Sequence, residues 1–192
     1  MPNWCQNDVT LSHTDPEMIK RAFTALENGT FLEEFIPVPE ALKNPASTTH
    51  GGENADAHNK LREELSNKYG YASWYDYCVN EWGTKWDVGE PGSTELSEDG
   101  LSLTTYFESA WAPPVSAYEK LADLGFDIKA YYCEEGVGFV GKWTLDGDEE
   151  YQIPPTSKKV LEQIPAELDD RFCISENKQN WEEEEAYDSK NE

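Results

Sequence analysis

Residues 80–92, NEWGTKWDVGEPG, bring a lysine, an aspartate and two tryptophans together within a few positions. A lysine supplies a cation and an aspartate a carboxylate, and tryptophan rings stack on cations or anchor protein interfaces. Two interpretations are open. In the first, Trp86 closes the core where the chain passes from a helix to a sheet and stacks with Trp4 and Trp111 at the ends of neighbouring elements, and Lys85 pairs with Asp87 or Glu108. In the second, Lys85, Trp86 and Trp111 lie exposed in one groove that binds a partner.

No residues have the spacing of a catalytic or metal site. The three histidines are isolated from one another in the sequence: His13, His50 and His58. The four cysteines include no Cys-x-x-Cys pair and no histidine at a zinc-ligand spacing: Cys5, Cys78, Cys133 and Cys173. We therefore expect reduced, buried thiols and predict no catalytic residue, no metal and no cofactor.

Glycines at positions 136, 138 and 141 repeat the GxGxxG spacing of dinucleotide-binding loops. That motif joins a strand to a helix, whereas here a strand-like pattern lies on each side of it. The spacing therefore indicates a β-hairpin turn. Two acids immediately before the turn, Glu134 and Glu135, are further candidate binding residues, together with Asp87.

The charge balance narrows the choice of partner. The chain has 15 Lys and Arg residues against 39 Asp and Glu, a net charge of −24. Such a surface repels nucleic-acid phosphates and acidic membranes, and it attracts basic proteins at rates that fall as salt rises. A run of acids near the C-terminus is the expected partner-binding surface: Glu182, Glu183, Glu184 and Glu185. Direct binding to nucleic acid or membrane is not expected.

Hydrophobic periodicity predicts the elements that position these residues. Alternation from Cys5 to His13 predicts a strand, and apolar residues at helical spacing from Met18 to Leu26 predict a helix. An insertion at about 31–92 follows. Its first part, 31–53, is rich in Pro and Gly and is expected to be irregular, and two helices are expected at 54–69 and 74–82.

After the insertion the pattern becomes strand-like again. A hairpin with an Asp-Gly turn is predicted over 95–107, then a helix from Pro113–Pro114 to Gly125, and strands at 126–132 and 139–145. The order predicts an α+β, ferredoxin-like (split βαβ) antiparallel sheet with helices on one face. We expect one domain at 1–155 and an acidic C-terminal extension at 156–192, partly helical or disordered.

Four stretches together carry a family resemblance: MPNWCQN, NEWGTKWD, FESAWAPP and YYCEEGVGFVGKW. In these the chain resembles the YubB-like ferredoxin-like domain proteins of bacteriophages and plasmids, from Met1 to about Asp146. The resemblance implies a ferredoxin-like fold with a helical insertion and an origin in a mobile element. It implies no catalytic residue.

These observations predict a non-enzymatic, acidic binding protein of a phage or plasmid. Carboxylates spread over a compact domain can stand in for phosphates, so the expected partner is a basic host protein of the nuclease, restriction or CRISPR effector class. The protein would act as a DNA mimic that inhibits its partner. The N-terminus has no signal-like segment and no apolar run approaches about 20 residues, so the host cytoplasm is the expected location.

Two alternatives remain. One is a protein that binds or processes a small molecule or nucleotide in a pocket between the sheet and the insertion. The polar groups of that pocket would be His13, His58, Lys85 or Glu134. The other is a structural role with self-association.

Overall fold

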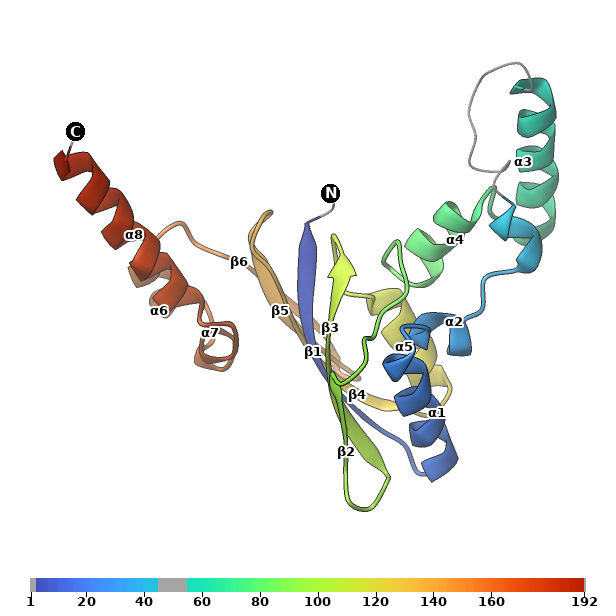
Figure 1. Ribbon diagram of the computed structural model, residues 1–192, viewed down its shortest axis with the longest axis horizontal. Helices are drawn as coiled ribbons and strands as arrows, with labels where there is room; N and C mark the ends of the chain where they lie inside the picture. The colour runs from blue at the N-terminus through green and yellow to red at the C-terminus, as the bar shows by residue number, and fades with distance from the viewer. Residues whose placement is uncertain (1–2, 45–54, 192) are drawn as a thin grey trace.

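The computed structural model describes residues 3–44 and 55–191, with side chains to residue 187. It is an α+β structure in which helices lie on both sides of a six-stranded antiparallel sheet (Figure 1). The strands, in the order β2-β3-β1-β4-β5-β6 across the sheet, are β2 Thr94–Leu96, β3 Ser102–Ala110, β1 Trp4–Ser12, β4 Asp127–Glu134, β5 Phe139–Thr144 and β6 Gly147–Gln152.

The strand β1 is central to this order because it pairs antiparallel with both β3 and β4. The two flanking strands therefore run parallel to each other, and the helix α5 (Val115–Asp123) connects them. Buried and partly exposed side chains alternate along β1, as the sequence predicted. Register places Trp4 opposite Ala110 of β3, which brings the N-terminal end of β1 next to the turn at Trp111.

The inner face of the sheet carries the main core. The helix α1 (Pro16–Glu27) begins where predicted, because the Asp15 carboxylate accepts a hydrogen bond from the Glu17 N–H at 3.0 Å and Pro16 occupies the first turn. The apolar face of α1 is fully buried at Ile19, Ala22 and Leu26. Together with α5 it covers Val9, Leu11, Leu103, Phe107 and Ile128 of the sheet.

The helical insertion is largely as predicted, with one correction. The helices α3 (Ala55–Tyr69) and α4 (Trp74–Glu81) agree with the predicted helices at 54–69 and 74–82. The stretch expected to be irregular contains α2 (Phe31–Phe35) and a 3-10 helix η1 (Glu40–Lys43), and its residues 45–53 lie outside the described part. Phe31 and Leu32 are buried in the main core, which holds α2 in place despite the neighbouring prolines.

The C-terminal segment, which was expected to be partly helical or disordered, is helical over most of its length and forms a second layer on the outer face of the sheet. It consists of α6 (Ser157–Gln163), α7 (Ala166–Phe172) and α8 (Ile174–Asn191), and Figure 1 shows these helices across the sheet from α1 and α5. A separate apolar cluster joins this layer to the sheet: Tyr131, Cys133, Val140, Val160, Ile164, Leu168 and Ile174. The expectation of helices on one face only was therefore wrong.

Two smaller predictions also need correction. The strand β6 was not predicted, because its sequence GDEEYQ is polar and lacks an alternating apolar pattern. The thiol of Cys173 is exposed, whereas the other three cysteines are buried as expected. Burial raises the pKa of Cys78 and of Cys133 to about 12, so those two thiols stay protonated at neutral pH. In the part of the chain that the structure describes, no helix is long and apolar enough to cross a membrane.

Candidate binding surface

The segment 80–92 is divided between core and surface. Trp82 is buried at 4% exposure, and its indole N–H donates a hydrogen bond to the Ile36 carbonyl at 2.9 Å. Trp86 is 38% exposed, and its ring centroid lies 5.8 Å from that of Trp4, which is 44% exposed. Trp82 therefore closes the junction between insertion and sheet, while Trp86 and Trp4 form an aromatic surface.

Lys85 lies at the centre of exposed rings. Its Nζ is 4.4 Å from the ring centroid of Trp86, 5.5 Å from that of Trp111 and 5.8 Å from that of Tyr75. The expected pairing with Asp87 or Glu108 does not occur, since Lys85 forms no ion pair within the described residues. Lys85 therefore lies beside Trp86 and Trp111 and is held by cation–π contacts, a grouping that the second interpretation expects. The contact of Trp86 with Trp4 is one that the first interpretation expects.

Trp111, whose ring lies beside Lys85, has an unusual backbone conformation. Trp111 has a φ of 69°, in the left-handed region that residues other than glycine seldom adopt. Its N–H donates a hydrogen bond to the Asn3 carbonyl at 2.9 Å, and the Ser109 hydroxyl donates one to the Ala112 carbonyl at 2.7 Å. The turn after β3 is thus fixed on both sides of a strained residue.

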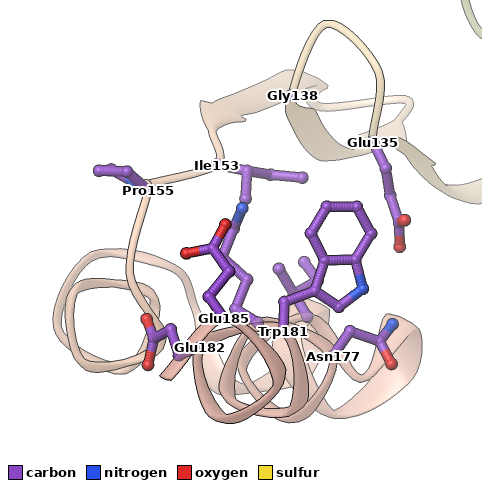
Figure 2. Close-up of a pocket in the computed structure, with 10 residues that line it drawn as sticks. Glu135, Gly138, Ile153, Pro155, Asn177, Trp181, Glu182 and Glu185 are labelled. Atoms are coloured by element: carbon purple, nitrogen blue, oxygen red, sulfur yellow. The ribbon is translucent and has the colours of Figure 1, made fainter. Parts of the chain in front are cut away.

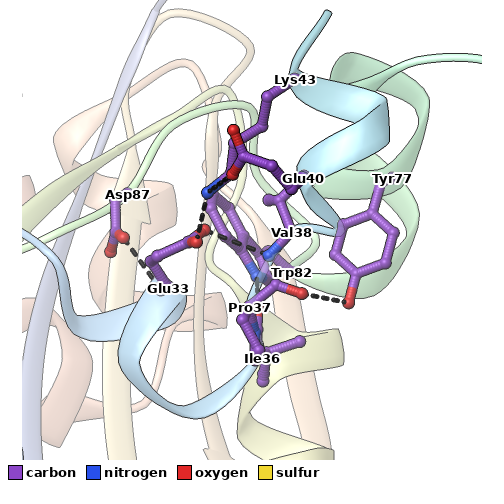
Figure 3. Close-up of polar contacts among 9 residues, drawn as sticks. All are labelled: Glu33, Ile36, Pro37, Val38, Glu40, Lys43, Tyr77, Trp82 and Asp87. Carbon is purple, nitrogen blue, oxygen red and sulfur yellow. Dashed lines mark hydrogen bonds and ion pairs between the residues drawn. The ribbon is translucent and has the colours of Figure 1, made fainter.

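Asp87 has a structural task. Its carboxylate accepts hydrogen bonds from the N–H groups of Leu32 at 2.7 Å and Glu33 at 2.9 Å, in the first turn of α2. Figure 3 shows it beside Glu33, which in turn accepts a bond from the Val38 N–H at 3.1 Å and binds Lys43. Burial raises the pKa of Asp87 above its ordinary value, although the backbone hydrogen bonds act to lower it.

Trp86 and Asp87 each line both of two surface hollows. One, of about 310 Å³, contains the cations Lys43 and Lys85. The other, of about 400 Å³, is also lined by Trp4, Tyr106, Glu90 and Glu108. The exposed face of Trp86 is therefore bordered by a basic and an acidic environment.

The two acids before the predicted hairpin turn have different roles. Glu134 is buried at 2% exposure and accepts hydrogen bonds from the N–H groups of Gly136 at 2.8 Å and Val137 at 2.6 Å. It therefore closes the β4–β5 turn, which is the hairpin predicted for the GxGxxG spacing. Glu135 is exposed and lines a hollow of about 240 Å³ between this turn and α8.

The acids of α8 also divide into two groups. Glu182 accepts hydrogen bonds from the N–H and the hydroxyl of Ser157, both at 2.8 Å, and so holds α8 against the start of α6. Figure 2 shows Glu182, Glu185 and Trp181 around the hollow that Glu135 also lines. Glu183 and Glu184 instead border a separate hollow with Asn180 and Tyr187.

The residues of the small-molecule alternative belong to separate elements. The Nδ1 of His13 accepts a hydrogen bond from the Asp15 N–H at 2.9 Å, whereas His58 lies on α3 and Glu134 in the hairpin turn. His50 is outside the described residues. Within the described residues, no group of three or more His, Cys, Asp or Glu side chains could hold a metal ion.

Comparison with known proteins gives one distant likeness. No protein-family model matches the chain, and no curated protein matches it. Among solved structures, the crystal structure of the protein api92 from Yersinia pseudotuberculosis, with the family description DUF1281, is 10% identical, with a TM-score of 0.40. The match covers 81% of this chain and 100% of that one. A similarity of this size assigns neither a family nor a function to the chain.

Proposed function

We propose that this protein is a non-enzymatic, acidic binding protein that occupies the basic surface of a partner protein. The observation that carries the proposal is the combination of carboxylates and large exposed aromatic side chains on α8. Trp181 is 71% exposed and Tyr187 is 70% exposed. Aromatic anchors surrounded by charged residues are typical of protein interfaces. A helix on the protein surface does not need two large exposed aromatic side chains for its own stability.

The spacing of four residues on α8 places them on one face of the helix. Asn180, Glu183, Glu184 and Tyr187 recur at intervals of three, four and seven residues, so they share one helix face. Within the described residues, the carboxylate of Glu183 accepts one hydrogen bond, from Gln179 four residues earlier, at 3.0 Å. A face with two carboxylates and a tyrosine is complementary to a basic surface that has an apolar depression.

The proposed partner is a basic host protein of the nuclease, restriction or CRISPR effector class, and the protein would inhibit it as a DNA mimic. The net charge of −24 supports this, because a surface that binds nucleic-acid phosphates also attracts carboxylates. The resemblance of four sequence stretches to phage and plasmid proteins supports an origin in a mobile element and action in a host bacterial cytoplasm.

The fold that we propose for the core is ferredoxin-like. The order β2-β3-β1-β4, with α1 before the β2–β3 hairpin and α5 between β3 and β4, supports this assignment. In this view β5, β6 and the helices α6 to α8 are additions at one side of the core. The additions carry Glu135 and the acidic helix, so the proposed binding surface lies partly outside the ferredoxin-like elements.

A capture experiment tests the function. The full-length protein would be immobilised and exposed to bacterial lysate at low and at raised salt, and captured proteins would be identified by mass spectrometry. We expect basic nucleic-acid-binding proteins to be retained at low salt and released as salt rises. Capture of no protein, or of proteins whose retention is indifferent to salt, would contradict the proposal. Light scattering of the free protein tests the alternative of self-association.

A further inference from the structure

The second hollow beside Trp86 lies over the C-terminal half of β3. The strand β2 pairs with β3 only between Leu103 and Thr105, so the rest of that edge of β3 is flanked by the segment 86–93. The outer helices pack on β4, β5 and β6, and they leave the outward side chains of β3 exposed. The hollow, of about 400 Å³, is thus an uncovered part of the outer sheet face.

Aromatic rings form the walls of this hollow. Trp4 comes from β1, Tyr106 from β3 and Trp86 from the loop after α4. Their side chains are 44%, 41% and 38% exposed, respectively. Lys85, which contacts Trp86, lines the neighbouring basic hollow and not this one. The rings are therefore available to a ligand that approaches from the sheet face.

Acids supply the charge of the hollow. Asp87, Glu90 and Glu108 line it, and the carboxylate of Asp87 is already bound to backbone N–H groups of α2. Glu90 and Glu108 are exposed, and neither forms an ion pair within the described residues. No lysine or arginine of the described chain lines it. Burial and then the charges of Glu108 and Glu90 raise the pKa of Tyr106, so both carboxylates act electrostatically at that hydroxyl. The hollow is negative as well as aromatic.

We propose that this hollow binds the guanidinium group of an arginine on the surface of a basic partner protein. A guanidinium is planar and weakly hydrated, so it can stack on an indole face while its N–H groups donate to carboxylates at the ring edge. A lysine ammonium is a compact, strongly hydrated charge and gains less from such a site. The inference rests on the proposed function, since it names the side chain by which a basic partner would be recognised away from α8.

The test uses peptides in place of the partner. The full-length, ¹⁵N-labelled protein would be titrated with acetyl-Gly-Arg-Gly-amide, and the indole N–H signals would be followed by NMR. We expect the signals of Trp4 and Trp86 to shift, with a dissociation constant on the order of millimolar, and that of the buried Trp143 to stay in place. The lysine peptide should bind more weakly. The citrulline peptide, which has the shape of arginine without its charge, should leave the signals unchanged.

Two matched variants separate this site from the general charge. Glu108→Gln should weaken arginine-peptide binding by about threefold to tenfold, because a charged acceptor becomes neutral. Glu98→Gln makes the same change at an exposed acid in the β2–β3 turn and should leave binding as it was. Unchanged backbone signals elsewhere establish that each variant is folded.

Three results would overturn the inference: no shift of Trp4 and Trp86, equal shifts with the citrulline peptide, or equal weakening in the two variants. None of these results involves a partner protein. A positive titration with no salt-sensitive capture from lysate would therefore contradict the proposed function alone. A negative titration with successful capture would contradict the arginine site alone.

Discussion

The carboxylate of Asp87 accepts a hydrogen bond from the N–H of Leu32, 55 residues earlier in the chain, at 2.7 Å. With the bond from Glu33, it satisfies two N–H groups of the first turn of α2, which would otherwise lack acceptors. The loop that presents Trp86 is therefore attached directly to the start of the insertion. The position of the aromatic surface depends on this attachment.

Replacing Asp87 tests that dependence. Asp87→Ala should lower the free energy of unfolding by about 1–2 kcal/mol, since the first turn of α2 loses its acceptors. Asp87→Asn keeps one acceptor oxygen and should cost less. Urea denaturation measures both. Asp127→Ala, at an exposed position where β4 begins, should change stability by at most about 0.5 kcal/mol, and an equal loss in this control would argue against the capping role.

The left-handed backbone at Trp111 predicts that glycine is tolerated better than alanine at this position. Glycine adopts a φ of 69° without strain, whereas alanine does not. Trp111→Gly should therefore be more stable than Trp111→Ala by about 1 kcal/mol, the reverse of the usual order. Thermal and urea denaturation of the two variants measure this difference, and an alanine variant that is the more stable would contradict the strain at this turn.

Glu81 should make stability depend on pH. It accepts hydrogen bonds from the Lys120 ammonium and the Tyr71 hydroxyl, and it is part-buried. Burial acts to raise its pKa, but the bonds from Lys120 and Tyr71 outweigh it, so the pKa lies below its ordinary value of 4.5. A lowered carboxyl pKa stabilises the folded state above the unfolded-state value, and this contribution is lost as pH falls through the folded-state pKa.

We therefore expect Glu81→Gln to be less stable than the unaltered protein at pH 7, by about 1 kcal/mol, and the difference to shrink as the solution is acidified below about pH 4.5. Urea denaturation over a pH series measures both quantities. Glu119→Gln, at an exposed position on α5, is the matched control and should show neither effect. A stability difference that is constant with pH would rule out the ionic contribution of Glu81.

Arg171 of α7 links the outer helices to the sheet. Its guanidinium pairs with Asp8 of β1 and lies 4.0 Å from the ring centroid of Tyr131 on β4. Arg171→Gln should speed amide hydrogen exchange in α6 to α8 several-fold and leave β1 and β3 protected. Arg171→Lys keeps the charge, loses the planar stack and should be intermediate. Uniformly faster exchange throughout the chain would contradict this local role.

The acids on the outer face of α8 should control partner association. With a captured partner in hand, Glu183→Gln combined with Glu184→Gln should slow association several-fold at low salt and have little effect on dissociation. Glu63→Gln combined with Glu64→Gln removes the same charge from adjacent exposed positions of α3. An equal effect of the two pairs would show that net charge alone determines the association rate. Surface plasmon resonance measures both rates.

The inner layer of the fold could be predicted because its pattern is strong. Buried side chains alternate along β1, and the apolar face of α1 recurs at helical spacing between clear start and stop residues. The outer layer could not be predicted in the same way. Its apolar contacts are spread over three helices, with Val160, Leu168 and Ile174 among many acids, and β6 has only Tyr151 partly buried.

The residues that form the candidate surface could be predicted from the sequence, but the hydrogen-bond partners of its acids could not. Element ends that carry tryptophan were expected to meet, and Lys85 does lie beside Trp86 and Trp111. The structural task of Asp87 could not be predicted, because its partners lie in a segment that showed no helical pattern. Glu134 was a candidate binding residue, yet its carboxylate is used by its own turn. The position of Glu134, two residues before the first glycine of the hairpin turn, was the sequence signal that could have predicted this role.

The polar sequence of β6 has a consequence for the purified protein. This strand is one edge of the sheet, and its backbone groups could pair with a strand of another chain. Asp148, Glu149 and Glu150 follow one another along that edge, so two copies aligned through β6 would place carboxylates against carboxylates. The opposite edge strand, β2, has 3 residues and offers little length for pairing. Resistance to fibrillar aggregation at high concentration should therefore decline as these carboxylates are protonated in acid.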